Sequence, residues 1–308
     1  MSELRQNPLT GEQVIIAPER GARPNAFDRP SRRGSTSLSS CPFCPGNEHE
    51  TPPEVFRKGE PWRLRVVPNK YPALDLPHEV IIESARHGAT IDDLPSDEML
   101  AVVETYRDRY LEHARNREVK YLSIFKNEGA GSGQSIDHLH SQLIALRDVP
   151  ERAKREAAAF SRLKHCPLCA LGRARASVIA RNETLALVAP PASRFAYEMA
   201  ILPLDHEPAF AATDLNSLAR MLQLAIAAMN RKLARPAYNW VVRNASPRAG
   251  RRTQAFHWSI EITPRLAQLG GFELGSGMYI NIISPETAAA ELRDAISERG
   301  ARSREHGQ

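Results

Sequence analysis

Long hydrophobic runs are missing from this sequence of 308 residues. The longest apolar stretches, such as LALVAPP and AILPL, are far shorter than the roughly 20 residues that a membrane-spanning helix needs. The first residues, MSELRQNPLTGEQ, lack the apolar core of a signal peptide. We therefore expect a cytoplasmic protein that does not contact a membrane.

Clusters of positive charge are also missing. The net charge of +5 comes from arginines scattered along the chain, and no block of lysine and arginine alternates with aromatic residues. This pattern argues against nucleic acid as a partner. We expect the basic side chains to serve a small phosphorylated substrate instead.

Cysteine is scarce, and all four cysteines stand in two copies of the motif Cys-Pro-x-Cys. The first copy holds Cys41 and Cys44, and the second holds Cys166 and Cys169. In a cytoplasmic chain such pairs are typical of metal ligands or of redox couples.

Each cysteine pair is followed by the same order of patterns. Two strand-like segments broken by proline lead to a histidine, and an amphipathic helical pattern follows over 94–116 or 215–235. Further strand-like segments then carry a second histidine. The two histidines are 51 residues apart in both copies, from 87 to 138 and from 206 to 257. Such a repeat indicates one supersecondary unit used twice.

This duplication predicts an α+β fold. We expect two tandem halves, 1–150 and 160–295, each an antiparallel sheet with a helix, packed into one unit. A charged helix-like stretch lies between the halves, and residues 296–308 are expected to form a polar tail.

Two cysteines and two histidines in each half make a set of four metal ligands. The first set is Cys41, Cys44, His87 and His138, and the second is Cys166, Cys169, His206 and His257. Thiolate and imidazole ligands in tetrahedral sets of four are typical of zinc. A closed set of ligands stabilises the fold and takes no part in chemistry, so we predict two structural zinc sites. A redox pair is the alternative for a single Cys-x-x-Cys motif.

The second histidine of the triplet HLH is the candidate nucleophile. His138 and His257 are equivalent in the repeat, so HLH in the first half aligns with HWS in the second. His140, expected on the same strand face as His138, aligns with Ser259 and has no metal to bind. A feature present in only one half is a candidate for function. Neutral imidazole is a competent nucleophile near neutral pH.

The glycine-rich segment NEGAGSGQS, residues 127–135, precedes this histidine. Such a loop turns backbone N–H groups toward an anion. It lacks the Gly-Lys-Ser/Thr of a P-loop, and a plain hairpin loop is the alternative. Beside a nucleophilic histidine, we expect the loop to bind phosphate.

The stretch NEGAGSGQSIDHLHSQ, both cysteine motifs, ERGARP near the N-terminus and the ending HWSIEITPRLAQLGGFELGSGMYIN resemble the histidine triad superfamily. Within it they are similar to the galactose-1-phosphate uridylyltransferase family, close to its two-zinc ADP-glucose phosphorylase-like members. The resemblance implies two histidine-triad-like halves and a homodimer. Leu139 and Ser141 stand where the family usually has proline and glycine.

The resemblance also implies roles for single residues. His140 would form a covalent nucleotidyl-histidine, and Gln142 would bind the phosphoryl oxygens. The implied contacts to the substrate's phosphates and sugar hydroxyls come from Arg20, Arg23, Asn127, Gly133, Ser135 and Glu273. Without the resemblance, the two arginines would be surface charges and Glu273 a polar residue beside a turn.

The implied function is transfer of a nucleotide between phosphorylated partners. The first hypothesis is a UDP-glucose–hexose-1-phosphate uridylyltransferase with ping-pong kinetics, whose substrates are a nucleoside diphosphate-sugar and a sugar 1-phosphate. The alternative is an ADP-glucose phosphorylase or adenylyltransferase that uses phosphate as acceptor. Gln142 disfavours a dinucleotide hydrolase, because an amide is neither an acid nor a base. A zinc-stabilised binding module is disfavoured because only one half holds His140 and Gln142.

The remaining histidines have no partner pattern. We interpret them as surface or loop residues: His49, His78, His113, His165 and His306.

Overall fold

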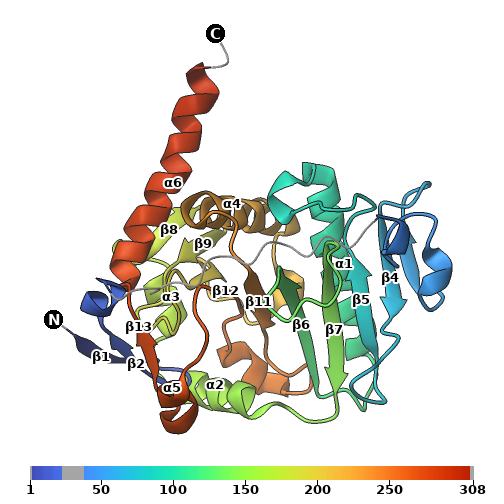
Figure 1. Cartoon of the computed structure of the whole chain (residues 1–308). Helices are drawn as coiled ribbons and strands as arrows, with labels where there is room; N and C mark the ends of the chain where they lie inside the picture. The colour runs from blue at the N-terminus through green and yellow to red at the C-terminus, as the bar shows by residue number, and fades with distance from the viewer. Residues whose placement is uncertain (1, 23–37, 306–308) are drawn as a thin grey trace.

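The computed structural model describes residues 2–22 and 38–305 (Figure 1). Ten of its strands form one antiparallel sheet in the order β3-β4-β5-β7-β6-β11-β12-β10-β9-β8. The strands of the first half are β3 (Phe56–Lys58), β4 (Leu64–Pro68), β5 (His78–Ile82), β6 (Tyr121–Glu128) and β7 (His140–Leu146). Those of the second half are β8 (Val178–Arg181), β9 (Leu185–Val188), β10 (Met199–Pro203), β11 (Tyr238–Arg243) and β12 (Ser259–Pro264).

Equivalent strands occupy equivalent places when the sheet is followed inward from either edge. The orders β3-β4-β5-β7-β6 and β8-β9-β10-β12-β11 meet where β6 pairs with β11 and Asn127 lies opposite Asn239. The predicted α+β fold with antiparallel sheets is confirmed, and the two expected sheets are continuous with each other. This junction pairs two strand edges that would otherwise be open.

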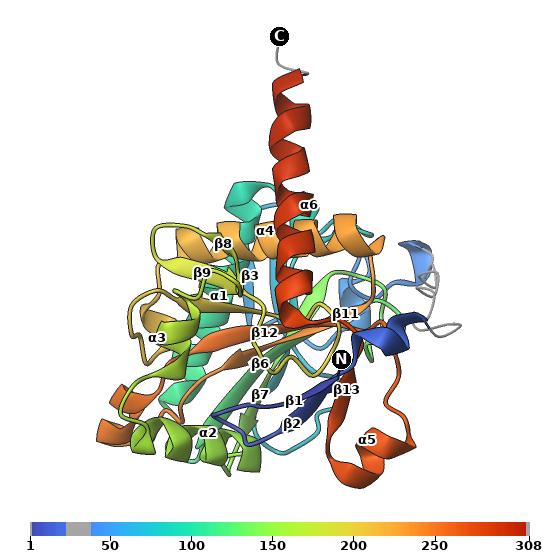
Figure 2. The ribbon, with the colours of Figure 1, turned by 90° about the vertical axis from the view of Figure 1, so that its left-hand side faces the viewer.

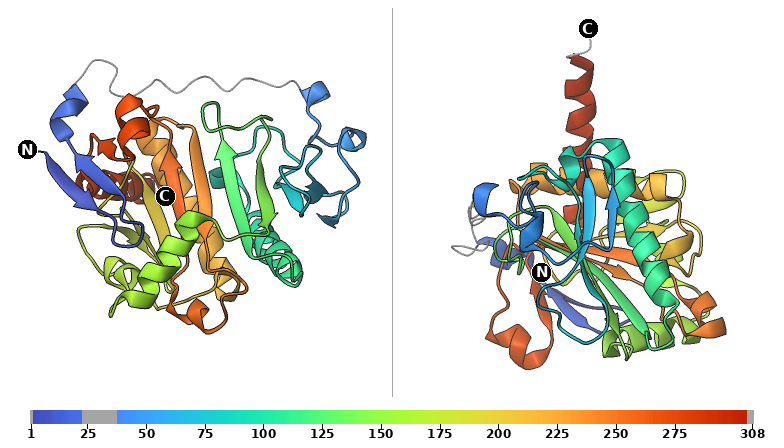
Figure 3. Two further views of the ribbon diagram at one scale, coloured as in Figure 1. Left: turned by 90° about the horizontal axis from the view of Figure 1, so that it is seen from below. Right: turned by 90° about the vertical axis from the view of Figure 1, so that its right-hand side faces the viewer.

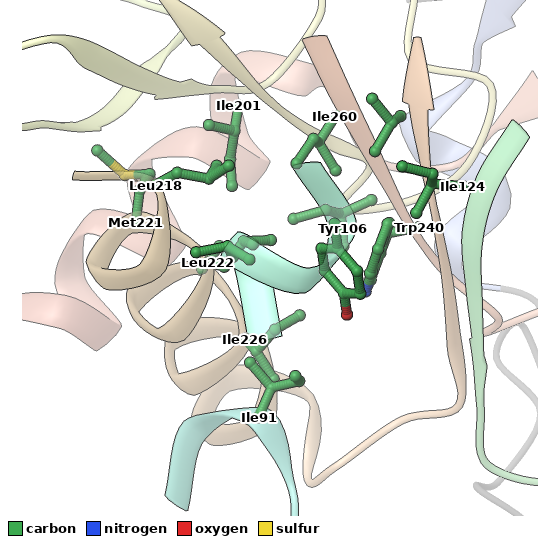
Figure 4. Packing of buried hydrophobic residues seen from close by; sticks show 14 of the residues in the cluster. Ile91, Tyr106, Ile124, Ile201, Leu218, Met221, Leu222, Ile226, Trp240 and Ile260 are labelled. Atoms are coloured by element: carbon green, nitrogen blue, oxygen red, sulfur yellow. The ribbon is translucent and has the colours of Figure 1, made fainter. Parts of the chain in front are cut away.

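Both predicted amphipathic helices pack on one face of this sheet. α1 spans Ser96–Ala114 and α4 spans Leu215–Leu233, close to the predicted ranges. Their apolar side chains meet those of the strands, among them Ile124, Trp240 and Ile260 (Figure 4). The main core therefore lies on this face. The opposite face carries smaller apolar clusters, one of them around Cys41 and Cys44.

A second sheet joins the two ends of the chain. It consists of β1 (Glu3–Gln6), β2 (Gln13–Ile16) and β13 (Tyr279–Asn281), with β2 in the middle (Figure 2). Arg5 also donates a hydrogen bond to Glu286 at 2.7 Å. The first residues thus lie beside the last strand, while the domain limits at 150 and 160 remain a prediction.

Helices outside the repeat complete the fold. They are α2 (Glu151–Arg162), α3 (Pro167–Leu171), α5 (Gly271–Ser276) and α6 (Pro285–Glu305). α2 coincides with the charged stretch between the halves. The predicted polar tail continues α6 as helix to Glu305, and this end extends away from the rest of the described chain (Figures 1 and 2). Among the described residues, no helix is long and apolar enough to cross a membrane.

Candidate active site

The first set of predicted metal ligands comes together in space. The Sγ atoms of Cys41 and Cys44 lie 3.5 and 3.7 Å from Nδ1 of His138. Cys44 Sγ also lies 3.3 Å from Nδ1 of His87. A tetrahedral zinc ion separates a sulfur from a nitrogen ligand by roughly 3.5 Å, given its usual bond lengths. His138 Nε2 donates to the carbonyl oxygen of Ser84 at 2.8 Å, which leaves Nδ1 for a metal. The donor set therefore fits zinc.

The second set has the same geometry. The Sγ atoms of Cys166 and Cys169 lie 3.3 and 3.4 Å from Nδ1 of His257, and Cys169 Sγ lies 3.6 Å from Nδ1 of His206. His206 Nε2 donates to the carbonyl oxygen of Gln254 at 3.0 Å. His206 is exposed, whereas His87 in the first set is half-buried. Both groups have the ligands to hold a metal ion, and the second is more open to solvent.

β7 presents the catalytic candidates by alternation. His140 and Gln142 line a cavity on the face of the cysteine motifs, while Ser141 and Leu143 point to the helix-covered core. β7 begins at His140. His138 therefore precedes the strand, and the prediction that both histidines share one strand face was wrong.

The two ring nitrogens of His140 differ in their surroundings. Nδ1 lies 2.7 Å from the carbonyl oxygen of His138 and donates its proton there, so Nε2 keeps its lone pair. Burial lowers the pKa of His140 to about 4, which keeps the ring neutral at neutral pH. Phe43, between the cysteines of the first motif, packs edge-on against the His140 ring, with the two ring centroids 5.3 Å apart. Nε2 is therefore a nucleophilic nitrogen on a ring whose orientation is held from two sides.

The side chain of Gln142 is held at its oxygen. Oε1 lies 2.8 Å from Nε2 of His78 and 3.4 Å from Nδ2 of Asn69. Its amide nitrogen makes no hydrogen bond within the part of the chain that the structure describes, so it remains available to a ligand.

A buried ion pair supports β7 from the core side. The side chains of Lys126 and Glu83 are fully buried, and Lys126 Nζ lies 2.7 Å from Glu83 Oε2. Lys126 also donates to the carbonyl oxygen of His140 at 2.8 Å. Glu83 accepts further hydrogen bonds from Tyr106 and Ser141. The backbone at His140 is thus bonded from behind to a network of charged and hydroxyl groups.

The glycine-rich loop turns as its composition predicts. Gly129 and Gly133 have φ values of +83° and +90°, a region that L side chains rarely adopt. A Cβ at Gly129 would also approach Ala237 to 3.1 Å. Asn127 donates to the Gly133 carbonyl oxygen at 3.5 Å and accepts a hydrogen bond from Asn239 at 2.7 Å. Glycine is needed here for the turn itself.

A cavity of about 710 Å³ lies over the first cysteine motif and β7, and its volume suits a ligand of nucleotide size. Three predicted site residues line it: Ser135, His140 and Gln142. Several other residues that line the cavity were not predicted from the sequence, including Phe43, Asn69, Lys70 and Tyr71. The proline-broken turn after β4 was the available signal for the last three, because turns at strand ends often carry function.

Other predicted substrate contacts lie elsewhere. Arg20 and Glu273 line a separate hollow of about 160 Å³. Among the described residues, none lines both this hollow and the cavity at His140. The 3₁₀ helix Pro18–Ala22 and α5, which carry them, lie at the end of the sheet opposite to β4 (Figure 3). Glu273 accepts a hydrogen bond from the backbone of Gly270 at 3.0 Å. Arg23 lies outside the described residues.

Two other histidines differ from their interpretation as surface or loop residues. His78 is the first residue of β5 and is buried, with its ring against Gln142. His113 lies in α1 with a side chain 12% exposed, and its Nε2 is 2.9 Å from Glu79 Oε1. A lone histidine carries no periodic signal of its own, so only the tertiary structure gave these rings partners. His306 lies outside the described residues.

The corresponding place in the second half is different. Ser259 stands at the position of His140, and Glu261 stands at that of Gln142; both line a separate cavity of about 350 Å³. Glu261 pairs with Arg152 at 2.5 Å and with Arg194 at 3.3 Å. Burial raises the pKa of Glu261, but these arginines outweigh it and lower the pKa below the usual value, so the carboxylate stays charged. The second half therefore places a charged, arginine-paired carboxylate where the first half has the neutral amide of Gln142.

Two family models match the chain. One, described as a domain of unknown function (DUF4921), covers residues 93–308, and the other, the N-terminal domain of DUF4931, covers residues 29–149. Among curated proteins, ADP-glucose phosphorylase of Arabidopsis thaliana is 33% identical over 95% of this chain and 92% of its own length. Galactose-1-phosphate uridylyltransferase of Thermotoga maritima is 28% identical over 97% of this chain and 100% of its own.

Solved structures give a similar result. ADP-glucose phosphorylase from Arabidopsis thaliana with bound ADP-glucose has a TM-score of 0.86 at 31% identity, covering 96% of this chain and 99% of that one. A uridylyltransferase structure has a TM-score of 0.75 at 23% identity, covering 97% of this chain and 99% of that one, and shows the shared fold.

Proposed function

Since the chain belongs to the galactose-1-phosphate uridylyltransferase family and is a nucleotidyltransferase, we propose that His140 carries the nucleotidyl group from a nucleoside diphosphate-sugar to a phosphate-bearing acceptor. One observation above all supports the proposal: Nδ1 of His140 is bonded to the His138 carbonyl, and Nε2 retains its lone pair on a ring that lines the cavity.

Each half-reaction is a displacement at the α-phosphorus. The Nε2 lone pair attacks, the Nε2–P bond forms, and the bond from phosphorus to the bridging oxygen breaks to release a sugar 1-phosphate. A phosphate oxygen of the acceptor then attacks the nucleotidyl-histidine, and the electron pair of the Nε2–P bond returns to Nε2. Gln142 has no acid or base function with which to activate water, which favours transfer over hydrolysis.

Hydrogen-bond donors at the cavity stabilise the charge that develops on the phosphoryl oxygens. In this proposal the donors are the amide nitrogen of Gln142 and the groups of the glycine-rich loop. Ser135 supports this assignment because it lines the cavity beside His140. Asn127 and Gly133 would act within the loop, where they bond to each other.

The relatives suggest two candidate nucleotide donors. ADP-glucose with phosphate as acceptor is favoured by the relative of 33% identity and by the structure with a TM-score of 0.86. UDP-glucose with a hexose 1-phosphate is favoured by the uridylyltransferase of 28% identity. Both remain candidates, with ADP-glucose the first to test.

We assign zinc to both Cys₂His₂ groups, because their sulfur–nitrogen separations of 3.3 to 3.7 Å match a zinc tetrahedron. When bound, zinc would tie each cysteine loop to two distant histidines, with no open position for chemistry. Four unpaired cysteines suit the reducing conditions of the cytoplasm, where we place the enzyme.

A homodimer would complete the site. If Arg20 and Glu273 contact the substrate, a second copy has to bring them, because in one chain they lie apart from His140. α5 and its preceding turn expose Leu269, Phe272 and Leu274, and the cavity rim exposes Tyr71. We propose that this apolar surface of one chain covers the cavity rim of its partner.

Intact-protein mass after brief incubation with ADP-glucose or UDP-glucose, without acceptor, tests the proposed function. A gain of one AMP from ADP-glucose is the expected result. A gain of one UMP from UDP-glucose would support the uridylyl alternative. No adduct from either donor in zinc-replete protein would overturn the proposal.

A further inference from the structure

The environment of Gln142 contains a histidine that the reaction scheme has not used. His78 in β5 pairs in register with Ile144 of β7, so its side chain lies diagonally beside Gln142 on the cavity face. It is 9% exposed, and its Nε2 lies 2.8 Å from Oε1 of Gln142.

The proton positions around this contact follow from two backbone donors. The N–H of Ala73 points at Nδ1 of His78 at 3.2 Å, so Nδ1 must accept and the ring proton must sit on Nε2. The N–H of Tyr71 donates to Oδ1 of Asn69 at 2.8 Å, so the other end of that amide is its NH₂ group.

Two donors therefore converge on one atom of Gln142. His78 Nε2–H and the Asn69 NH₂ group both face it, at 2.8 and 3.4 Å, and only the amide oxygen can accept from both. Asn69 Nδ2 also lies 3.1 Å from His78 Nε2, but with the ring proton on Nε2 both atoms are donors and make no hydrogen bond with each other. The NH₂ group of Gln142 is then turned away from His78. His78 begins β5, whereas Asn69 and Tyr71 belong to the turn between β4 and β5 and line the cavity.

We propose that His78 is a positioning residue that holds the Gln142 amide with its NH₂ group toward the phosphoryl oxygens. Asn69 acts as the second, weaker donor. This inference rests on the proposed function, because it gives Gln142 a phosphoryl group to bind. Without His78 only the weaker Asn69 donor opposes rotation of the amide, and the orientation that places its oxygen against a phosphoryl oxygen is repulsive.

Replacement of His78 tests the inference, with nucleotidyl-adduct formation, kcat, donor KM, zinc content and Tm as measurements. His78→Phe should slow adduct formation and kcat by about 10-fold or more, because one oriented donor is worth roughly 100-fold. Donor KM, zinc content and Tm should change little. His78→Gln should recover most of the rate, because its amide can donate to Gln142.

His113 provides the matched control. It is another histidine with little exposure, but it contacts Glu79 and Arg109 away from the cavity. His113→Phe should leave adduct formation within about 3-fold of wild type, as expected for a residue that touches no reacting group. Equal losses in His113→Phe and His78→Phe would overturn the proposal.

A double-mutant cycle with Gln142→Ala separates positioning from a structural role. If His78 acts through Gln142, the double variant His78→Phe/Gln142→Ala should react no more slowly than Gln142→Ala alone. Multiplying effects would overturn the inference, as would full activity in His78→Phe. The wild-type adduct is measured first, so its absence counts against the proposed function and a normal rate in His78→Phe counts against this inference alone.

Discussion

One hydrogen bond decides which nitrogen of His140 is nucleophilic. Because Nδ1 donates to the His138 carbonyl, the reactive lone pair is on Nε2. His140→Ala should form no nucleotidyl adduct and lose turnover by roughly 10⁴-fold or more, as loss of a nucleophile does. Tm and zinc content should stay at wild-type values, as in the exposed control His165→Ala, because only the first histidine of HLH, His138, is a predicted metal ligand. Loss of zinc in His140→Ala would contradict this division of roles.

The buried pair Lys126 and Glu83 is the second feature at the residue scale. Lys126→Met leaves the Glu83 carboxylate buried without its cation, so we expect a loss of about 3–5 kcal/mol in the free energy of unfolding. Adding Glu83→Gln should restore part of that loss. Lys120, whose exposed side chain lies 3.9 Å from Asp148, is the control, and Lys120→Met should cost less than about 1 kcal/mol. Urea unfolding measures all three, and equal losses at Lys120 and Lys126 would contradict the interpretation.

At the scale of elements, the first metal group is connected to the start of β7. Nδ1 of His138 faces the two cysteines, and its carbonyl oxygen accepts a hydrogen bond from His140 two residues later. In the proposed mechanism, zinc bound to this group would therefore help to orient the nucleophile. The second group has no such connection, because the residue two positions after His257 is Ser259, whereas the residue two positions after His138 is His140.

Cysteine variants of the two groups should therefore behave differently. Cys41→Ser should lose one zinc equivalent and lower adduct formation by roughly 10-fold or more, since loss of ligand support typically costs 10–100-fold. Cys169→Ser should also lose one equivalent but keep most adduct formation per folded molecule. Metal analysis and intact-protein mass on the same samples test this expectation. Equal loss of adduct in both variants would contradict a special role of the first metal group in orienting His140.

At the scale of the whole molecule, the proposed homodimer would make Arg20 and Glu273 part of the partner's site. His140→Ala and Glu273→Ala should each be impaired as homodimers. An equimolar mixture of the two variants should regain about a quarter of wild-type activity, because about half of its dimers are mixed and each mixed dimer has one intact site out of two. Light scattering should report a dimer. Mixtures no more active than their components would show that these residues do not act across subunits.

Much of the fold was predictable because it depends on local periodicity and on the duplication. The helices over 94–116 and 215–235, the strand pairs around them and both sets of four metal ligands follow from spacing alone, and α1, α4 and the two clusters lie where expected. β1, β2 and β13 were not predicted. They are short, and their pairing joins residues nearly the whole chain apart.

The sequence by itself determined which chemical groups are present: a histidine in one half with no counterpart in the other, a neighbouring amide, and two sets of thiols and imidazoles with the spacing of metal ligands. This was possible because the two halves repeat each other: residues present in both halves are candidates for structural roles, and residues present in only one half are candidates for function. Tertiary structure decided how those groups are oriented. The amide of Gln142 turned by His78 and the pairing of Lys126 with Glu83 depend on atoms from β5, β6 and the turns next to them. Hydrogen bonds between segments far apart in the chain leave no periodic trace, so only the folded chain reveals them.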